Sequence, residues 1–236
     1  MKKIIPNAIT SANLFCGCLA VTQIAEGNLA MASLFVILGA FFDFFDGMAA
    51  RLLKVTSPVG AELDSLADMI TFGLAPSYLV FVWLNNIEIS ILNYGAFLLA
   101  VFSAIRLAKF NVDDRQTTSF IGLPTPANAL FWISLPMLEI QVENGFGLFD
   151  LHVLGDLFQN LLALFPLIGL FSYLLIAELP LLSLKFKTFV WEGNEYRFIL
   201  LIFSGVLIGL FYFAAIPFII TLYLILSIIQ NNLKPQ

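Results

Sequence analysis

Eight apolar stretches follow one another along this chain, separated by short polar segments. They cover residues 8–24, 28–50, 60–84, 90–108, 124–141, 158–180, 198–213 and 216–231. A bilayer-spanning helix needs about 20 apolar residues and satisfies its own backbone hydrogen bonds, so we expect each stretch to cross a membrane. The last two could instead form one bent helix that breaks before Pro217. With 60% hydrophobic and 11% charged residues, the composition also predicts an all-α, polytopic transmembrane bundle rather than a soluble domain.

The basic residues predict how these helices are oriented, because loops rich in lysine and arginine stay on the cytoplasmic side of a membrane. With eight crossings and both termini in the cytoplasm, the inner segments contain every base of the chain: Lys2, Lys3, Arg51, Lys54, Arg106, Lys109, Arg115, Lys185, Lys187, Arg197 and Lys234. If the eighth crossing were absent, only Lys234 would lie on the other side of the membrane. The distribution of basic residues therefore supports the first seven crossings more strongly than the eighth. We expect a multi-pass protein of the cell (inner or plasma) membrane, with residues 43–68 at the cytoplasmic surface.

Four aspartates lie near the junction of the second and third apolar stretches: Asp43 and Asp46 at the end of the second, and Asp64 and Asp68 at the start of the third. If one helix ends near residue 53 and the next begins at Pro58 after an N-cap at Ser57, each helix presents two of these carboxylates on one face. Clustered charges at a membrane surface are costly unless they are compensated, and carboxylates readily bind divalent cations. The pattern therefore predicts a metal site shared by two helices.

Two residues beside these acids suggest the ligand of the site. Gly47 lacks a side chain, so a bulky group can approach the backbone, and Arg51 about one turn later can hold a phosphate. The alternative is a polar loop whose acids are merely solvated. A solvated loop, however, would not need Gly47 and Ala50 on the same face as the acids.

The spacing D-x2-D-G-x2-A-R-x8-G-x3-D-x3-D, from Asp43 to Asp68, resembles the signature of the CDP-alcohol phosphotransferase family at every specified position. The resemblance implies a membrane enzyme that moves a phosphate-bearing group from a CDP-linked lipid to the hydroxyl of a small alcohol and releases CMP. It implies two Mg²⁺ or Mn²⁺ ions and a homodimer. Independently of the resemblance, the net charge of −5 argues against a nucleic-acid partner. The resemblance also implies that all four aspartates hold the metals and that Asp68 is the general base. The implied contacts to the CDP-lipid are Gly47, Ala50, Arg51, Ser57 and Gly60.

The opening run PNAITSANLFCG is unusually polar for a membrane crossing. Asn7, Thr10 and Asn13 fall on one face of a helical wheel. They could hydrogen-bond to neighbouring helices. We favour a role in binding the CDP-lipid, because the run resembles the PN-x2-T-x2-N opening common in the phosphatidylserine synthases of the same family.

A second stretch, RLAKFNVDDRQTTSFIGLPTPANA at residues 106–129, resembles the same branch of the family. It could be a basic membrane anchor followed by a proline-rich turn. The resemblance implies instead that CDP-diacylglycerol and L-serine are the substrates. The candidate contacts to serine are then Arg106, Lys109, Asn111 and, further along the chain, Lys185.

The resemblance covers residues 6 to about 190. We therefore expect a membrane domain at residues 1–190 with a six-helix core, and two further transmembrane helices at 191–236 packed on it. Three alternatives stay open: a sibling transferase that uses inositol phosphate, glycerol 3-phosphate or choline, a divalent-cation transporter, and a catalytically silent scaffold. A transporter would place acids near the middle of the bilayer on several helices, whereas these acids cluster at its edge.

Overall fold

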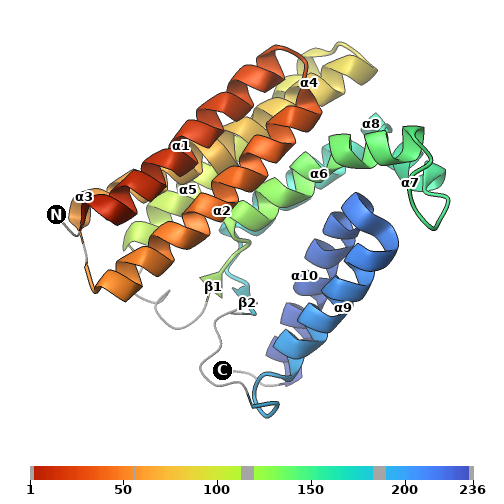
Figure 1. Cartoon of the computed structure of the whole chain (residues 1–236). Coiled ribbons are helices and arrows are strands. Elements are labelled where there is room, and N and C mark those ends of the chain that lie inside the picture. Colours follow the sequence, from red (N-terminus) through yellow and green to blue (C-terminus); the bar gives the residue numbers. More distant parts are fainter. Residues whose placement is uncertain (1–2, 56, 113–119, 183–189, 234–236) are drawn as a thin grey trace.

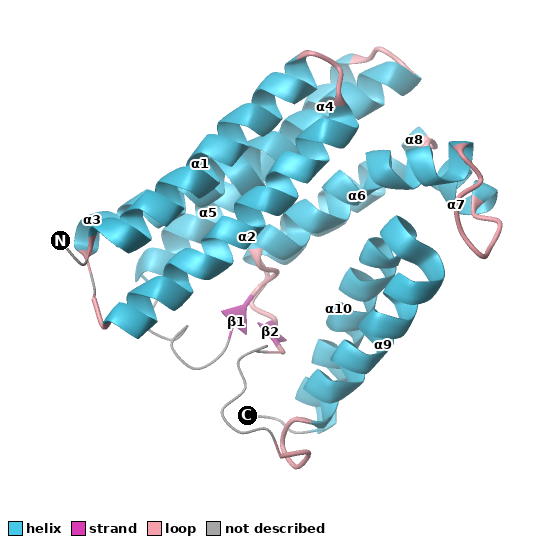
Figure 2. Cartoon of the chain, in the orientation of Figure 1, coloured by secondary structure: helices cyan, strands magenta, loops and turns pink. Residues whose placement is uncertain are grey.

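The computed structural model describes residues 3–55, 57–112, 120–182 and 190–233, and most of them are helical (Figures 1 and 2). The first helices are α1 (Ile4–Ala25), α2 (Leu29–Leu53) and α3 (Pro58–Asp68), which continues through a π-helix, η1 (Met69–Leu74), into α4 (Ala75–Ile87). A 3₁₀ segment, η2 (Ile91–Phe97), leads into α5 (Leu98–Val112). The remaining helices are α6 (Thr125–Glu143), α7 (His152–Phe158), α8 (Leu161–Ile176), α9 (Glu195–Phe211), the 3₁₀ turn η4 (Tyr212–Ala214) and α10 (Ala215–Leu233).

Five helical runs in the described part of the chain are long and apolar enough to cross a membrane. They are Ile4–Ala25, Leu29–Leu53, Pro58–Ile87, Ile91–Val112 and Glu195–Asn231, and the pair α7–α8, bent by 70°, would make a sixth. The prediction of a nearly all-α protein with several apolar, membrane-type helices is thus confirmed. The count of eight crossings and the orientation stay predictions. Figure 1 shows that the longest run is folded back on itself, with α9 and α10 packed side by side.

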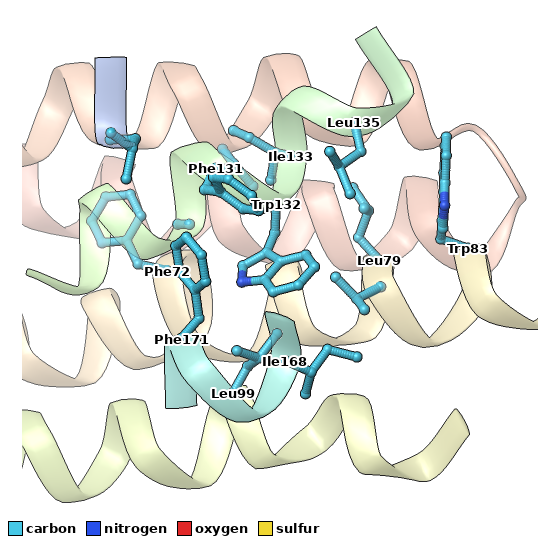
Figure 3. Packing of buried hydrophobic residues seen from close by; sticks show 14 of the residues in the cluster. Phe72, Leu79, Trp83, Leu99, Phe131, Trp132, Ile133, Leu135, Ile168 and Phe171 are labelled. Atoms are coloured by element: carbon cyan, nitrogen blue, oxygen red, sulfur yellow. The ribbon is translucent and has the colours of Figure 1, made fainter. Parts of the chain in front are cut away.

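The core is centred on α6, which is buried around most of its circumference. Its Trp132 is completely buried, and the ring packs edge-on against Phe171 of α8 with ring centroids 5.5 Å apart (Figure 3). Phe131 approaches the same phenylalanine at 4.2 Å. Because large aromatic side chains bury much apolar surface, these contacts join α6 to α8. On its other sides α6 contacts α2, α4 and α10.

A two-stranded antiparallel sheet, which the sequence pattern did not predict, lies beside this core. Strand β1 (Phe120–Ile121) pairs with β2 (Pro180–Leu181), so that Ile121 lies opposite Pro180. The predicted helical stretch 158–180 is therefore wrong at its end, since α8 stops at Ile176. The sheet brings the segment before α6 next to the segment after α8.

Candidate active site

The turn between the two helices that present the aspartates lies where the sequence predicted. The helix α2 ends at Leu53, and Lys54 follows in a left-handed conformation with φ of 51°. Ser57 caps α3 by accepting a hydrogen bond from the backbone N–H of Gly60 at 3.3 Å, and Pro58 occupies the first helical position. This turn and the packing of α1 against both helices place the aspartates near one another.

Three of the four predicted carboxylates form a tight cluster. Asp43 of α2 and Asp64 and Asp68 of α3 each offer an oxygen, and these oxygens lie within 4.8 Å of one another. All three side chains are half-buried. Asp64 Oδ1 is buried without a hydrogen-bond partner among the described residues. An all-oxygen donor set with an unsatisfied buried oxygen fits a hard divalent cation such as Mg²⁺ or Mn²⁺.

Asp46 lies beside this cluster but outside it. Its side chain is buried, and its Oδ2 accepts a hydrogen bond of 2.6 Å from the hydroxyl of Thr10 on α1. A short hydrogen bond to a charged acceptor is stronger than one between neutral groups, so Thr10 determines which way this carboxylate points. Asp46 nevertheless lies within electrostatic range of Asp43 and Asp64.

A cavity of about 250 Å³ opens next to the carboxylates, between α1 and the α2–α3 turn. Its lining includes Asp46, Asp64 and six of the residues predicted to contact a CDP-lipid: Asn7, Thr10, Gly47, Ala50, Ser57 and Gly60. Arg51 is exposed and does not line the cavity. Its guanidinium lies over Gly47, 3.5 Å from the position that a Cβ would occupy there. At Gly60 a Cβ would come within 2.8 Å of Asn7 Oδ1, so this glycine allows α3 to approach α1 closely.

Asn13, the eighth predicted lipid contact, is completely buried and is not part of the cavity lining. Its Nδ2 donates to Asp68 Oδ1 at 3.3 Å. Its backbone carbonyl accepts a hydrogen bond of 3.1 Å from Thr71, a residue of the π-helix η1 that the sequence analysis missed. Two glycines on other helices could have indicated Thr71, because Gly17 and Gly39 both leave room for its side chain.

The residues predicted to bind serine are separated in the structure. Arg106 of α5 is buried and lies within electrostatic range of Asp68. Lys109 is exposed, and the exposed Asn111 exchanges hydrogen bonds with Ser65, the closer being 3.0 Å. Lys185 lies outside the described residues. Of the three that are described, Arg106 is therefore the strongest candidate for a residue that acts at the carboxylate cluster.

The fold and the site together define a class: a helical, membrane-type protein with a carboxylate cluster beside a cavity that opens between its first helices. The family model described as CDP-alcohol phosphatidyltransferase matches residues 3–181. The chain belongs to this family.

Several curated proteins named CDP-diacylglycerol–serine O-phosphatidyltransferase resemble the chain, among them the following three. The Bacillus subtilis protein is 43% identical over 126 residues, which cover 52% of this chain and 69% of the relative. A Helicobacter pylori protein is 34% identical over 142 residues, or 57% of each chain. The Methanocaldococcus jannaschii protein is 35% identical over 134 residues, or 57% of this chain and 61% of the relative. The chain thus spans less than two thirds of the second and third of these relatives.

Proposed function

We propose that this protein transfers the phosphatidyl group of CDP-diacylglycerol to the hydroxyl of L-serine and releases CMP. The observation that carries the proposal is the cluster of Asp43, Asp64 and Asp68 beside a cavity lined by residues of the family signature. The relatives named above support serine as the acceptor. Membership of the family supports the use of a CDP-linked donor.

Divalent ions, Mg²⁺ or Mn²⁺, would be held by Asp43, Asp64 and Asp68, with Asp46 as the fourth carboxylate of a two-ion site. Bound there, they would supply positive charge that neutralises the diphosphate of the donor. Thr10 and Asn13 each orient one carboxylate through a hydrogen bond. Such partners of metal ligands commonly change metal affinity or activity by 10- to 100-fold when they are removed.

The protein side chains can then be assigned to the parts of the reaction. Asp68 accepts the proton of the serine hydroxyl while the serine oxygen forms a bond to the phosphorus and the bond from phosphorus to the CMP oxygen breaks. Arg106 offers a buried positive charge to the serine carboxylate. Arg51 contacts the diphosphate in this proposal, which the position of its guanidinium over Gly47 supports.

Three further points belong to this proposal. The site faces the cytoplasm, because the basic residues Arg51 and Lys54 lie at the α2–α3 turn and such residues stay on the cytoplasmic side. The protein forms a homodimer, as the family resemblance implies. Residues 1–190 form the catalytic membrane domain, and two transmembrane helices in 191–236 pack on it.

The experiment that tests the function is CMP release by purified full-length protein in detergent. CDP-diacylglycerol is supplied with serine, inositol phosphate, glycerol 3-phosphate or no alcohol, each with Mg²⁺, Mn²⁺ or EDTA. We expect release that requires both serine and a divalent ion. Release with another alcohol would contradict serine as the acceptor, and metal-independent release would contradict the role of the carboxylate cluster.

A further inference from the structure

The π-helix η1 carries a buried polar residue, Thr71, to which the proposed mechanism gives no part. Its side chain is completely buried. The hydroxyl donates a hydrogen bond of 3.1 Å to the backbone carbonyl of Asn13 on α1. A carbonyl oxygen has two lone pairs, so it can accept this bond and the usual backbone hydrogen bond of a helix at once. The contact therefore joins η1 to α1 without interrupting α1.

The same residue of α1 also contacts Asp68. Asn13 is completely buried, and its Nδ2 donates to Asp68 Oδ1 at 3.3 Å. Asp68 and Thr71 lie three residues apart on one continuous helical run, so both can face α1. This run thus contacts Asn13 twice, once through the Asn13 side chain and once through its backbone. The two contacts together determine how the end of α3 and the start of η1 lie against α1.

The side-chain amide of Asn13 depends on this placement. Its Oδ1 is buried without a hydrogen-bond partner among the described residues, so within that part of the chain the bond to Asp68 is what directs the amide. An N–H···O hydrogen bond is usually about 2.7–3.2 Å long and is lost by about 3.6 Å. A shift of roughly 0.3 Å between α1 and η1 would therefore release Asp68 from Asn13.

Two glycines show how closely the helices pack around Thr71. A Cβ on Gly39 of α2 would lie 2.5 Å from Thr71 Cγ2 and 3.0 Å from Asn13 Oδ1, so both side chains lie against the same stretch of backbone. A Cβ on Gly17 of α1 would clash with the Thr71 hydroxyl. Close packing of this kind leaves little room for small shifts. The two branches of Thr71 thus have separate partners: the methyl group contacts α2, and the hydroxyl contacts Asn13.

We propose that Thr71 is a positioning residue whose hydroxyl keeps Asn13 aligned with Asp68 and thereby orients the Asp68 carboxylate for turnover. The inference rests on the proposed function, in which Asp68 accepts the proton of the serine hydroxyl. Thr71 does not line the cavity beside the carboxylates. We therefore expect it to influence kcat and to leave the affinity for both substrates unchanged.

The variants Thr71→Val and Thr71→Ser separate the hydroxyl from the methyl group. Valine keeps the shape of threonine but cannot donate, so kcat for CMP release should fall roughly three- to tenfold, with the KM values for serine and CDP-diacylglycerol within about twofold of wild type. Serine keeps the hydroxyl, so its kcat should stay within about twofold, while its unfolding temperature in detergent falls because a buried methyl group is lost.

Ser77→Ala on α4 is the matched control. It removes another completely buried hydroxyl, which donates to the carbonyl of Leu74 within the same helical run. Its kcat should stay within about twofold of wild type. If the valine variant does not fold, Thr71→Ala and Thr71→Ser make the same comparison, since both lack the methyl group and they differ in the hydroxyl.

A double-mutant cycle with Asn13→Ala identifies the route of the effect. If Thr71 acts through Asn13, loss of its hydroxyl should lower the kcat of the Asn13→Ala protein by less than about twofold, because the alignment is already lost. An unchanged kcat without the hydroxyl, or a loss that persists in full beside Asn13→Ala, would overturn the proposal. Equal losses of kcat in Thr71→Ser and Ser77→Ala would also overturn it, because general packing would then be the cause. Wild-type protein that releases no CMP with serine refutes the proposed function, whereas an active wild type with additive variants refutes this inference alone.

Discussion

At the scale of single residues, the carboxylates of the site differ in what their oxygens contact. Asp46 is held by Thr10 and Asp68 by Asn13, whereas one buried oxygen of Asp64 has no partner among the described residues. A carboxylate that already accepts a hydrogen bond has a determined orientation. We therefore expect the side chains of Asp46 and Asp68 to keep a fixed orientation, and the unpaired oxygen of Asp64 to be open to a ligand.

Asp68→Asn tests the proposed base. Asparagine has nearly the same shape and its oxygen can still accept from Asn13, but it cannot take a proton from the serine hydroxyl. We expect CMP release to fall by at least about 100-fold, while CDP-diacylglycerol and the divalent ion still bind. Equilibrium binding of both, measured beside the rate, separates the two effects. Turnover near the wild-type rate would exclude Asp68 as the base.

Asn13→Ala distinguishes the role suggested by the sequence from the one suggested by the structure. If Asn13 orients Asp68, kcat should fall about 10- to 100-fold with little change in the KM for CDP-diacylglycerol. Asn7→Ala is the matched control, because Asn7 lies on the same helix and lines the cavity. It should mainly raise the KM for the lipid. The same rise in Asn13→Ala would instead support direct contact of Asn13 with the lipid.

At the scale of elements, the π-helix Met69–Leu74 follows Asp68 directly. Its Thr71 fits between α1 and α2, where a Cβ on Gly17 would lie 2.4 Å from Thr71 Oγ1 and a Cβ on Gly39 would lie 2.5 Å from Thr71 Cγ2. The hydrogen bond from the Thr71 hydroxyl to the carbonyl of Asn13 opposes movement of the Thr71 side chain out of this position. Insertions of this kind often accompany functional sites, and here the insertion connects the position of Asp68 to the packing of three helices.

Gly39→Ala should therefore destabilise the protein by about 1–3 kcal/mol, since the added methyl group overpacks this contact. It should also lower turnover, because Asn13 Oδ1 lies 3.0 Å from the same Cβ position. Gly205→Ala on α9 is the control, as nothing lies within 4 Å of its Cβ position. That change should stabilise the helix by up to about 1 kcal/mol. Thermal unfolding in detergent measures both variants, and equal unfolding temperatures would contradict the expected overpacking.

At the scale of the whole molecule, the proposed orientation places the α2–α3 turn in the cytoplasm and the turn after α4 outside. In a background without Cys16 and Cys18, we expect a membrane-impermeant thiol reagent to label Glu88→Cys in intact cells and Lys54→Cys in inverted vesicles. Glu192→Cys, just before α9, should behave like Lys54→Cys, because the six crossings predicted before it return the chain to the cytoplasmic side. Labelling of Lys54→Cys in intact cells would contradict the proposed orientation and indicate the opposite one.

The local features of the site followed from the sequence alone. Helical periodicity, the Ser57 cap and Pro58 predicted where α2 ends and α3 begins, because those effects act within a few residues. Apolar stretches of membrane-spanning length predicted a helical membrane protein for the same reason. The family resemblance, which rests on local motifs, predicted six residues that line the cavity.

Only the tertiary structure decided which of these groups meet. It separated Asp46 from the other three carboxylates, joined Asn13 to Asp68 and paired β1 with β2. These relations join segments that are far apart in the chain. They depend on how whole helices pack and on which buried polar groups must share partners, and no local pattern of residues contains that information.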